Sequence, residues 1–107
     1  MLYLRICFDK KDGGALRDEL RQSHREYIGS HLAGGKAIKV VQGGPMCVGD
    51  DITTNLGSFL VIDAPSLAVA REFHDNDPFT RAKLFERADV VRWDRHIGNE
   101  SQEKYVP

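Results

Sequence analysis

The chain has 107 residues, of which 41% are hydrophobic and 29% charged, a composition typical of a globular domain rather than of a disordered or membrane-embedded segment. Its 15 basic and 16 acidic residues leave a formal net charge of −1, and no basic block is interleaved with aromatic residues, so no nucleic-acid partner is expected. No apolar run reaches the roughly 20 residues of a membrane span, and the first residues lack the pattern of a secretory signal, which predicts a cytoplasmic protein with no membrane partner.

The first part of the chain predicts a strand, a helix and a second strand. Apolar residues alternate with others over residues 2–8 (LYLRICF), which is the period of a half-buried strand. After a charged break containing glycine, apolar residues recur at helical spacings from Leu16 to Leu32, and Gly34 and Gly35 are expected to end this helix. Residues 36–42 (KAIKVVQ) predict the second strand.

The second part predicts a strand, a helix and a final strand. A turn-rich loop over residues 43–57 precedes a third strand at residues 58–63 (SFLVID), which we expect to pair antiparallel with the second. Ser66 is a plausible N-cap of a helix that should finish by Asn76 or Asp77, because the residue before Pro78 avoids the α region. Residues 79–86 favour a further helical turn or two, and residues 89–97 (DVVRWDRHI) the fourth strand.

This β-α-β-β-α-β order predicts an α+β fold of the ferredoxin-like type, with a four-stranded antiparallel sheet that carries both helices on one face. Side chains such as Leu4, Val91 and Trp93 would then form an apolar patch on the other face, and dimerisation, sheet against sheet, would cover it. Residues 1–97 form the expected domain and residues 98–107 a polar C-terminal tail, unless a partner subunit orders Tyr105 and Val106.

His24 and Arg21 are the first candidates for chemistry. Steps of four from Leu16 reach His24 and Ile28, so the imidazole shares the stripe that should face the sheet. It is either a core histidine with satisfied nitrogens or a partly buried acid–base group lining a pocket, a role suited to an unperturbed pKa of about 6.5. Arg21 is either a solvated surface residue or the cation that holds a substrate carboxylate, phenolate or enolate.

The stretch EFHDNDPFTR (residues 72–81) offers a similar choice at Asp77. Asp77 is either a turn initiator whose carboxylate bonds the amides after it, or the carboxylate that orients an imidazole and stabilises its protonated form. His74 and Asp75 are interpreted as helix-end residues, because the helix dipole already favours a histidine near a C-terminus.

Other chemistries find little support in the motifs. His24 and His31 are seven residues apart with no cysteine nearby, so no metal is expected. The glycine pairs lack the spacing of a phosphate-binding loop, and no cofactor is expected. Cys7 and Cys47 show no C-x-x-C spacing and are expected to stay reduced.

Four short motifs together resemble the YciI-like proteins: RQSH at residues 21–24, GGP at 43–45, GS at 57–58 and DPF at 77–79. Their order and separations match over residues 1 to about 97, and the match weakens over residues 46–55. The resemblance implies a ferredoxin-like fold of the dimeric α+β barrel type, and a pocket with a histidine–aspartate dyad that would be His24 and Asp77. It also implies pocket or substrate-binding positions at Arg21, Gly44, Pro45 and Ser58.

These interpretations predict a homodimeric, enzyme-like protein for cofactor-free proton transfer on a small organic molecule, by elimination, isomerisation or hydrolysis. His24 would be the acid or base, Asp77 its orienter, and Arg21 or Ser58 the stabiliser of developing negative charge. Two alternatives stay open: a non-catalytic small-molecule-binding module that uses the same pocket, and a dimerisation domain in which His24 is only structural.

Overall fold

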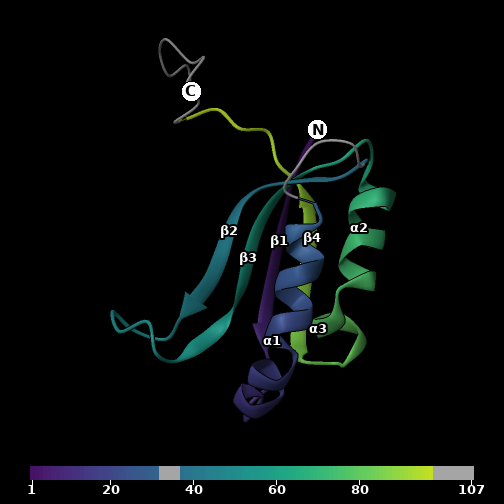
Figure 1. The fold of residues 1–107 in the computed structure, drawn as a ribbon. Coiled ribbons are helices and arrows are strands. Elements are labelled where there is room, and N and C mark those ends of the chain that lie inside the picture. The colour runs from purple at the N-terminus through teal and green to yellow at the C-terminus, as the bar shows by residue number, and fades with distance from the viewer. Residues whose placement is uncertain (32–36, 98–107) are drawn as a thin grey trace.

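A computed structural model describes residues 1–31 and 37–97, which form one four-stranded antiparallel sheet with α1 and α2 on the same face (Figure 1). The elements in chain order are β1 (Leu2–Asp9), α1 (Gly14–Gly29), β2 (Lys39–Cys47), β3 (Asn55–Asp63), α2 (Leu67–Asn76), α3 (Pro78–Arg81) and β4 (Phe85–Arg92). The strand order is β2-β3-β1-β4, so the predicted ferredoxin-like arrangement is confirmed. None of the helices in the described ranges is long and apolar enough to span a membrane.

Helix α1 is shorter than predicted. It ends at Gly29, whereas the expected stop at Gly34 and Gly35 lies outside the described residues. The Ser30 hydroxyl donates to the Tyr27 carbonyl oxygen at 2.7 Å, and His31 Nδ1 lies 2.8 Å from the same oxygen. Such local side-chain bonds to the backbone compete with another helical turn. The predicted C-terminal tail, with Tyr105 and Val106, also lies outside the described residues.

Strands β2 and β3 are longer than predicted, and the loop between them is correspondingly shorter. Their antiparallel pairing is confirmed, and it continues with Pro45 opposite Ser58 and Met46 opposite Gly57. The expected loop over residues 43–57 was therefore wrong at both ends. A proline is tolerated in β2 because this is an edge strand of the sheet. Register shifts after Val40 and Met46 mark irregularities that bend the pair, whose loop projects from the body in Figure 1.

The boundaries around α2 follow local chemistry as predicted. Ser66 Oγ accepts a hydrogen bond from the Val69 amide at 3.2 Å, and the helix ends at Asn76. The next segment differs: α3 stops at Arg81 and β4 already begins at Phe85 rather than at residue 89, ending at Arg92. Lys83 has a φ of 61°, and this left-handed turn directs the chain back into the sheet too early for a second helical turn.

The helix-covered face of the sheet holds the core. Tyr3, Arg5 and Cys7 of β1 are only 2%, 1% and 0% exposed, so the intervening Leu4 points to the opposite face. Leu4 pairs with Val91, which is 44% exposed, and the predicted apolar character of the helix-free face is confirmed for these two residues. The main hydrophobic cluster comprises Tyr3, Ile38, Val40, Leu60, Ile62, Ala64, Ala70 and Phe73.

Gly57 permits a close approach of β3 to β1. A Cβ at this position would lie 1.8 Å from the Cys7 carbonyl oxygen and 3.0 Å from the Phe8 Cα, both backbone atoms. No side chain can therefore be added without moving one strand. The next residue, Ser58, is buried opposite Cys7, so the same approach positions the serine of the GS motif.

Replacement of Gly57 by alanine is expected to lower the free energy of unfolding by at least about 1–3 kcal/mol, the range for overpacked interiors. The matched control is Gly44→Ala in β2, where an added Cβ meets nothing within 4 Å. We expect the control to stay within about 0.5 kcal/mol of the wild type. Urea unfolding measures both variants, and equal stabilities would contradict the close approach.

Candidate functional site

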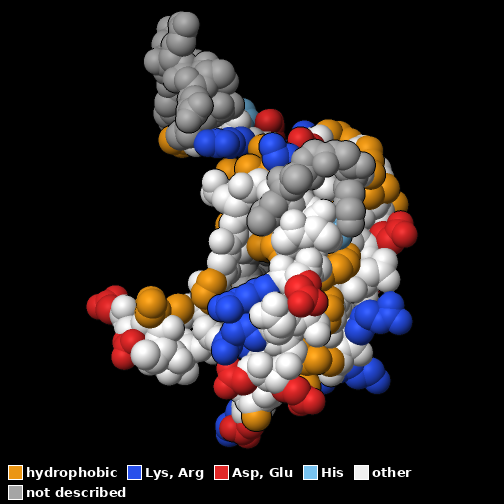
Figure 2. Space-filling view, viewed as in Figure 1, with side chains coloured by type: hydrophobic (Ala, Val, Ile, Leu, Met, Phe, Trp, Pro, Cys, Tyr) orange, Lys and Arg blue, Asp and Glu red, His pale blue; other side chains and the backbone are white. Residues whose placement is uncertain are grey.

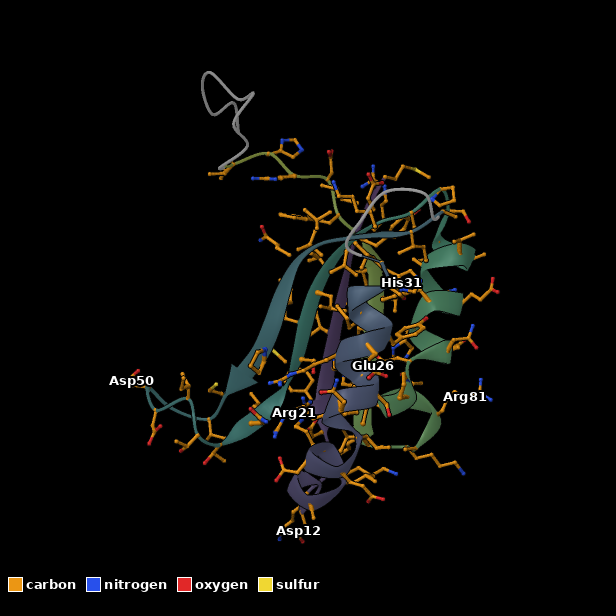
Figure 3. The ribbon with its side chains drawn as sticks, in the orientation of Figure 1. Asp12, Arg21, Glu26, His31, Asp50 and Arg81 are labelled. Carbon is orange, nitrogen blue, oxygen red and sulfur yellow. The ribbon has the colours of Figure 1, made fainter. Side chains whose placement is uncertain are left out.

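A cavity of about 450 Å³ lies between α1 and the bent β2–β3 pair. In Figure 2 the same region is hollowed, with blue arginine or lysine side chains at its edge, and Figure 3 shows Arg21 projecting from α1 on this side. The structure places five of the six predicted site residues in its lining, the sixth being Asp77 behind it. The lining includes Arg17, Arg21, His24 and Arg25 of α1, Gly44, Pro45 and Ser58 of the strands, and Phe79.

The structure brings His24 and Asp77 together. His24 Nδ1 lies 2.9 Å from Asp77 Oδ1, and the imidazole stacks on the Phe79 ring with centroids 4.0 Å apart and planes 12° apart. The side chain of Asp77 is 0% exposed and that of His24 is 16% exposed. The stack and the carboxylate fix the orientation of the imidazole at the cavity wall.

Asp77 occupies a turn and also contacts the imidazole of His24. Asp77 has an extended backbone between α2 and α3, and its Oδ1 accepts a 2.9 Å hydrogen bond from the Phe79 amide, as a turn residue does. Its Oδ2 accepts a 2.7 Å bond from Arg5 Nη1. Burial alone would raise the pKa of Asp77, but the hydrogen bond with His24 and the Arg5 charge outweigh it, so the pKa lies below its ordinary value.

An ionised Asp77 determines which tautomer of His24 is present. A carboxylate can only accept hydrogen bonds, so His24 Nδ1 must carry the proton between them. In the neutral imidazole the other nitrogen, Nε2, then has a free lone pair. That nitrogen is the atom suited to take or return a proton.

Arg5 is a residue of this region that the sequence did not reveal. Its side chain is 1% exposed, and besides binding Asp77 it donates from Nε to His74 Nδ1 at 2.8 Å. Burial and the nearby Arg5 charge lower the pKa of His74, which favours the neutral ring that this bond requires. His74 is therefore more than the helix-end residue expected. The only available signal was that Arg5 alternates with the buried Tyr3 and Cys7.

Arg17 and Ser58 form a second polar group under the cavity. Arg17 is 5% exposed and donates to both carboxylate oxygens of Asp9, from Nε at 2.6 Å and from Nη2 at 2.7 Å. The same Nη2 donates to Ser58 Oγ at 3.0 Å. The Arg17 guanidinium also lies over the Phe79 ring, 4.8 Å from its centroid. Because Ser58 accepts from Arg17, its own hydroxyl hydrogen can point to a ligand.

Arg21 is a partly exposed residue of the cavity wall. It pairs with Asp18 at 2.6 Å, and its side chain is 39% exposed, as for a surface residue. It nevertheless lines the cavity, as do Gly44 and Pro45 from β2. In the described part of the chain, no three histidine, cysteine, aspartate or glutamate side chains gather as metal ligands would. Cys7 and Cys47 are free thiols.

The solved structures that match the chain include one of similar sequence and fold. It is 5-chloro-2-hydroxyhydroquinone dehydrochlorinase (TftG) from Burkholderia phenoliruptrix AC1100, in complex with 2,5-dihydroxybenzoquinone. The TM-score is 0.77 and the identity 33%, over 88% of this chain and 94% of the other. None of the curated protein sequences compared matches the chain significantly. The model of the YCII-related domain matches residues 1–94, and the chain therefore belongs to the family of YCII-related domains.

Proposed function

We propose that the protein is an enzyme that performs cofactor-independent acid–base chemistry on a small hydroxylated ring compound, with elimination of a leaving group as the reaction to test first. The observation that carries the proposal is the place of His24, held between the buried Asp77 carboxylate and a cavity of about 450 Å³. The similarity to a dehydrochlorinase supports the choice of reaction. A cavity of this volume suits a single ring.

In such an elimination, His24 Nε2 takes the proton of a ring hydroxyl and returns it to the ring carbon that bears the leaving group. Loss of a second hydroxyl proton to the same nitrogen then lets the leaving group depart with its bonding electron pair. The net loss is one proton and one anion, so no oxidant or reductant is needed. Asp77 stabilises the imidazolium, and Arg21 and Ser58, which also line the cavity, stabilise the ring oxyanion.

We also propose that a second copy of the chain covers the helix-free face of the sheet. Strand pairing places Ile6 beside Phe59, and Leu4 beside the exposed Val91 and the buried Val61, on that face. An apolar surface of this kind on a small domain favours association. The dimer would be isologous, because the same face meets itself.

The dimer predicts that Val91→Asp shifts the protein to monomers, because each copy would bring a carboxylate into the apolar contact. Light scattering coupled to size exclusion measures the mass. The control is Ala68→Asp, on the exposed side of α2. A wild-type protein that is already monomeric at high concentration would overturn this part of the proposal.

Asp77→Asn is expected to move the His24 proton from Nδ1 to Nε2. Asp77 accepts three donors on two oxygens, whereas asparagine has one oxygen, which the charged Arg5 should retain. The new amide group then faces His24 and donates to Nδ1. Nitrogen-15 NMR of the ring distinguishes the tautomers, with Asp94→Asn beside the exposed His96 as control. Retention of the Nδ1 proton in Asp77→Asn would contradict the assigned orientation.

His24→Ala is expected to lower kcat by about 10²–10⁴, the usual contribution of general acid–base catalysis. Chloride release from 5-chloro-2-hydroxyhydroquinone and related ring compounds is the measurement. The control is His96→Ala, whose side chain is 61% exposed outside the cavity. Unchanged turnover in His24→Ala would contradict the acid–base role of His24. A stable complex of 2,5-dihydroxybenzoquinone with no turnover of any ring compound would favour the binding-module alternative instead.

A further inference from the structure

The wall of the cavity formed by α1 is strongly basic. Arg17, Arg21 and Arg25 follow one another at intervals of four residues, so they lie along one side of the helix, and all three line the cavity. No aspartate or glutamate is among the described residues of the lining. A ligand in this space therefore meets positive charge without a facing carboxylate.

The three arginines differ in how far their charge is already neutralised. Asp9 holds Arg17 through two hydrogen bonds, and Asp18 pairs with Arg21 at 2.6 Å. Within the described ranges, the exposed side chain of Arg25 takes part in no ion pair or hydrogen bond. Its guanidinium is thus the one of the three that has all its donors available for a ligand.

None of the described residues that line the opposite wall is charged. This wall is made of the β2–β3 pair and its loop, including Pro45, Ile52, Thr53 and Asn55. Arg25 is exposed, so solvent screens part of its charge, but the uncharged lining opposite it adds no competing carboxylate. The distribution of charge hence favours an anion before any chemical step occurs.

We propose that the cavity selects a planar ring compound that is already anionic when it binds, and that Arg25 is the residue that sets this specificity. The anion is a ring carboxylate or an ionised ring hydroxyl, since a guanidinium binds a carboxylate through two parallel hydrogen bonds and a phenolate oxygen through a charge-assisted one. Arg21 assists from one helical turn away when Asp18 yields to the ligand. The inference rests on the proposed function, because it concerns the same cavity, but it requires binding only and no turnover.

The test is calorimetric titration of the full chain at pH 7.5 with two pairs of probes. One pair is 2,5-dihydroxybenzoate and its neutral amide, 2,5-dihydroxybenzamide; the other is ionised 2,5-dihydroxybenzoquinone and its neutral dimethyl ether. The pairs separate carboxylate from ring oxyanion as the preferred group. The variants are Arg25→Gln, Arg25→Lys and the control Arg71→Gln, which makes the same change of charge at an exposed α2 position outside the cavity.

In the wild type, at least one anion should bind more tightly than its neutral partner, and added salt should reduce the difference. Arg25→Gln should weaken the binding of that anion by about twofold to fivefold and leave the binding of the neutral probe unchanged, as expected for loss of one ion pair at an exposed side chain. Arg25→Lys should retain part of the preference, and Arg71→Gln all of it.

Failure of both anions to bind more tightly than their neutral partners overturns the proposal, as does an equal effect of Arg25→Gln and Arg71→Gln. The outcome is separable from that of the proposed function. An anion preference that depends on Arg25, together with turnover that ignores His24, would leave the anion site standing and remove the acid–base role. Turnover that depends on His24 without an anion preference would support the acid–base role and remove the anion site.

Discussion

The buried ion pair between Arg5 and Asp77 is the interaction on which the site depends. Both side chains are almost fully removed from water, at 1% and 0% exposure, so burial of either charge without the other would strongly destabilise the fold. Arg5 belongs to β1 and Asp77 to the α2–α3 junction, and the pair therefore ties the sheet to the helices. His74 accepts a second hydrogen bond from Arg5, and the Phe79 amide donates to Asp77 Oδ1. The remaining partner of the Asp77 carboxylate is the imidazole of His24.

His24 and Arg17 present two chemically different groups beside Phe79. The imidazole of His24 stacks on the Phe79 ring, and the guanidinium of Arg17 also lies over that ring. The first group is backed by a carboxylate and can hold a proton. The second is neutralised by Asp9 and presents Ser58 as a hydroxyl donor. A proton acceptor and a donor for an oxyanion thus share one cavity, and this pairing, rather than the fold, supports a catalytic function.

The fold was predictable where local chemistry sets it. Alternation over residues 2–8, the cap at Ser66 and the stop before Pro78 each depend on near neighbours in the chain, and the structure agrees with all three. The ends of β2 and β3 were not predictable in the same way. Gly43, Gly44 and Pro45 favour a loop in the sequence. Strand β2 nevertheless continues through them, because it pairs with β3 at these residues. The requirement for glycine at position 57 likewise comes from the Cys7 backbone, which local sequence does not show.

The order of the elements was predictable from the amino-acid pattern alone, and the resemblance of the motifs indicated His24 and Asp77 as candidates. Spacing alone left both with an ordinary structural interpretation. The contact between His24 and Asp77 became evident only in three dimensions. The same holds for the hydrogen bonds that join Arg5 to Asp77 and His74, and for the burial of Arg17. These contacts join residues that are far apart in the sequence, because Arg5 binds His74 and Asp77 across separations of 69 and 72 residues. A periodic pattern does not indicate which buried charge will neutralise which.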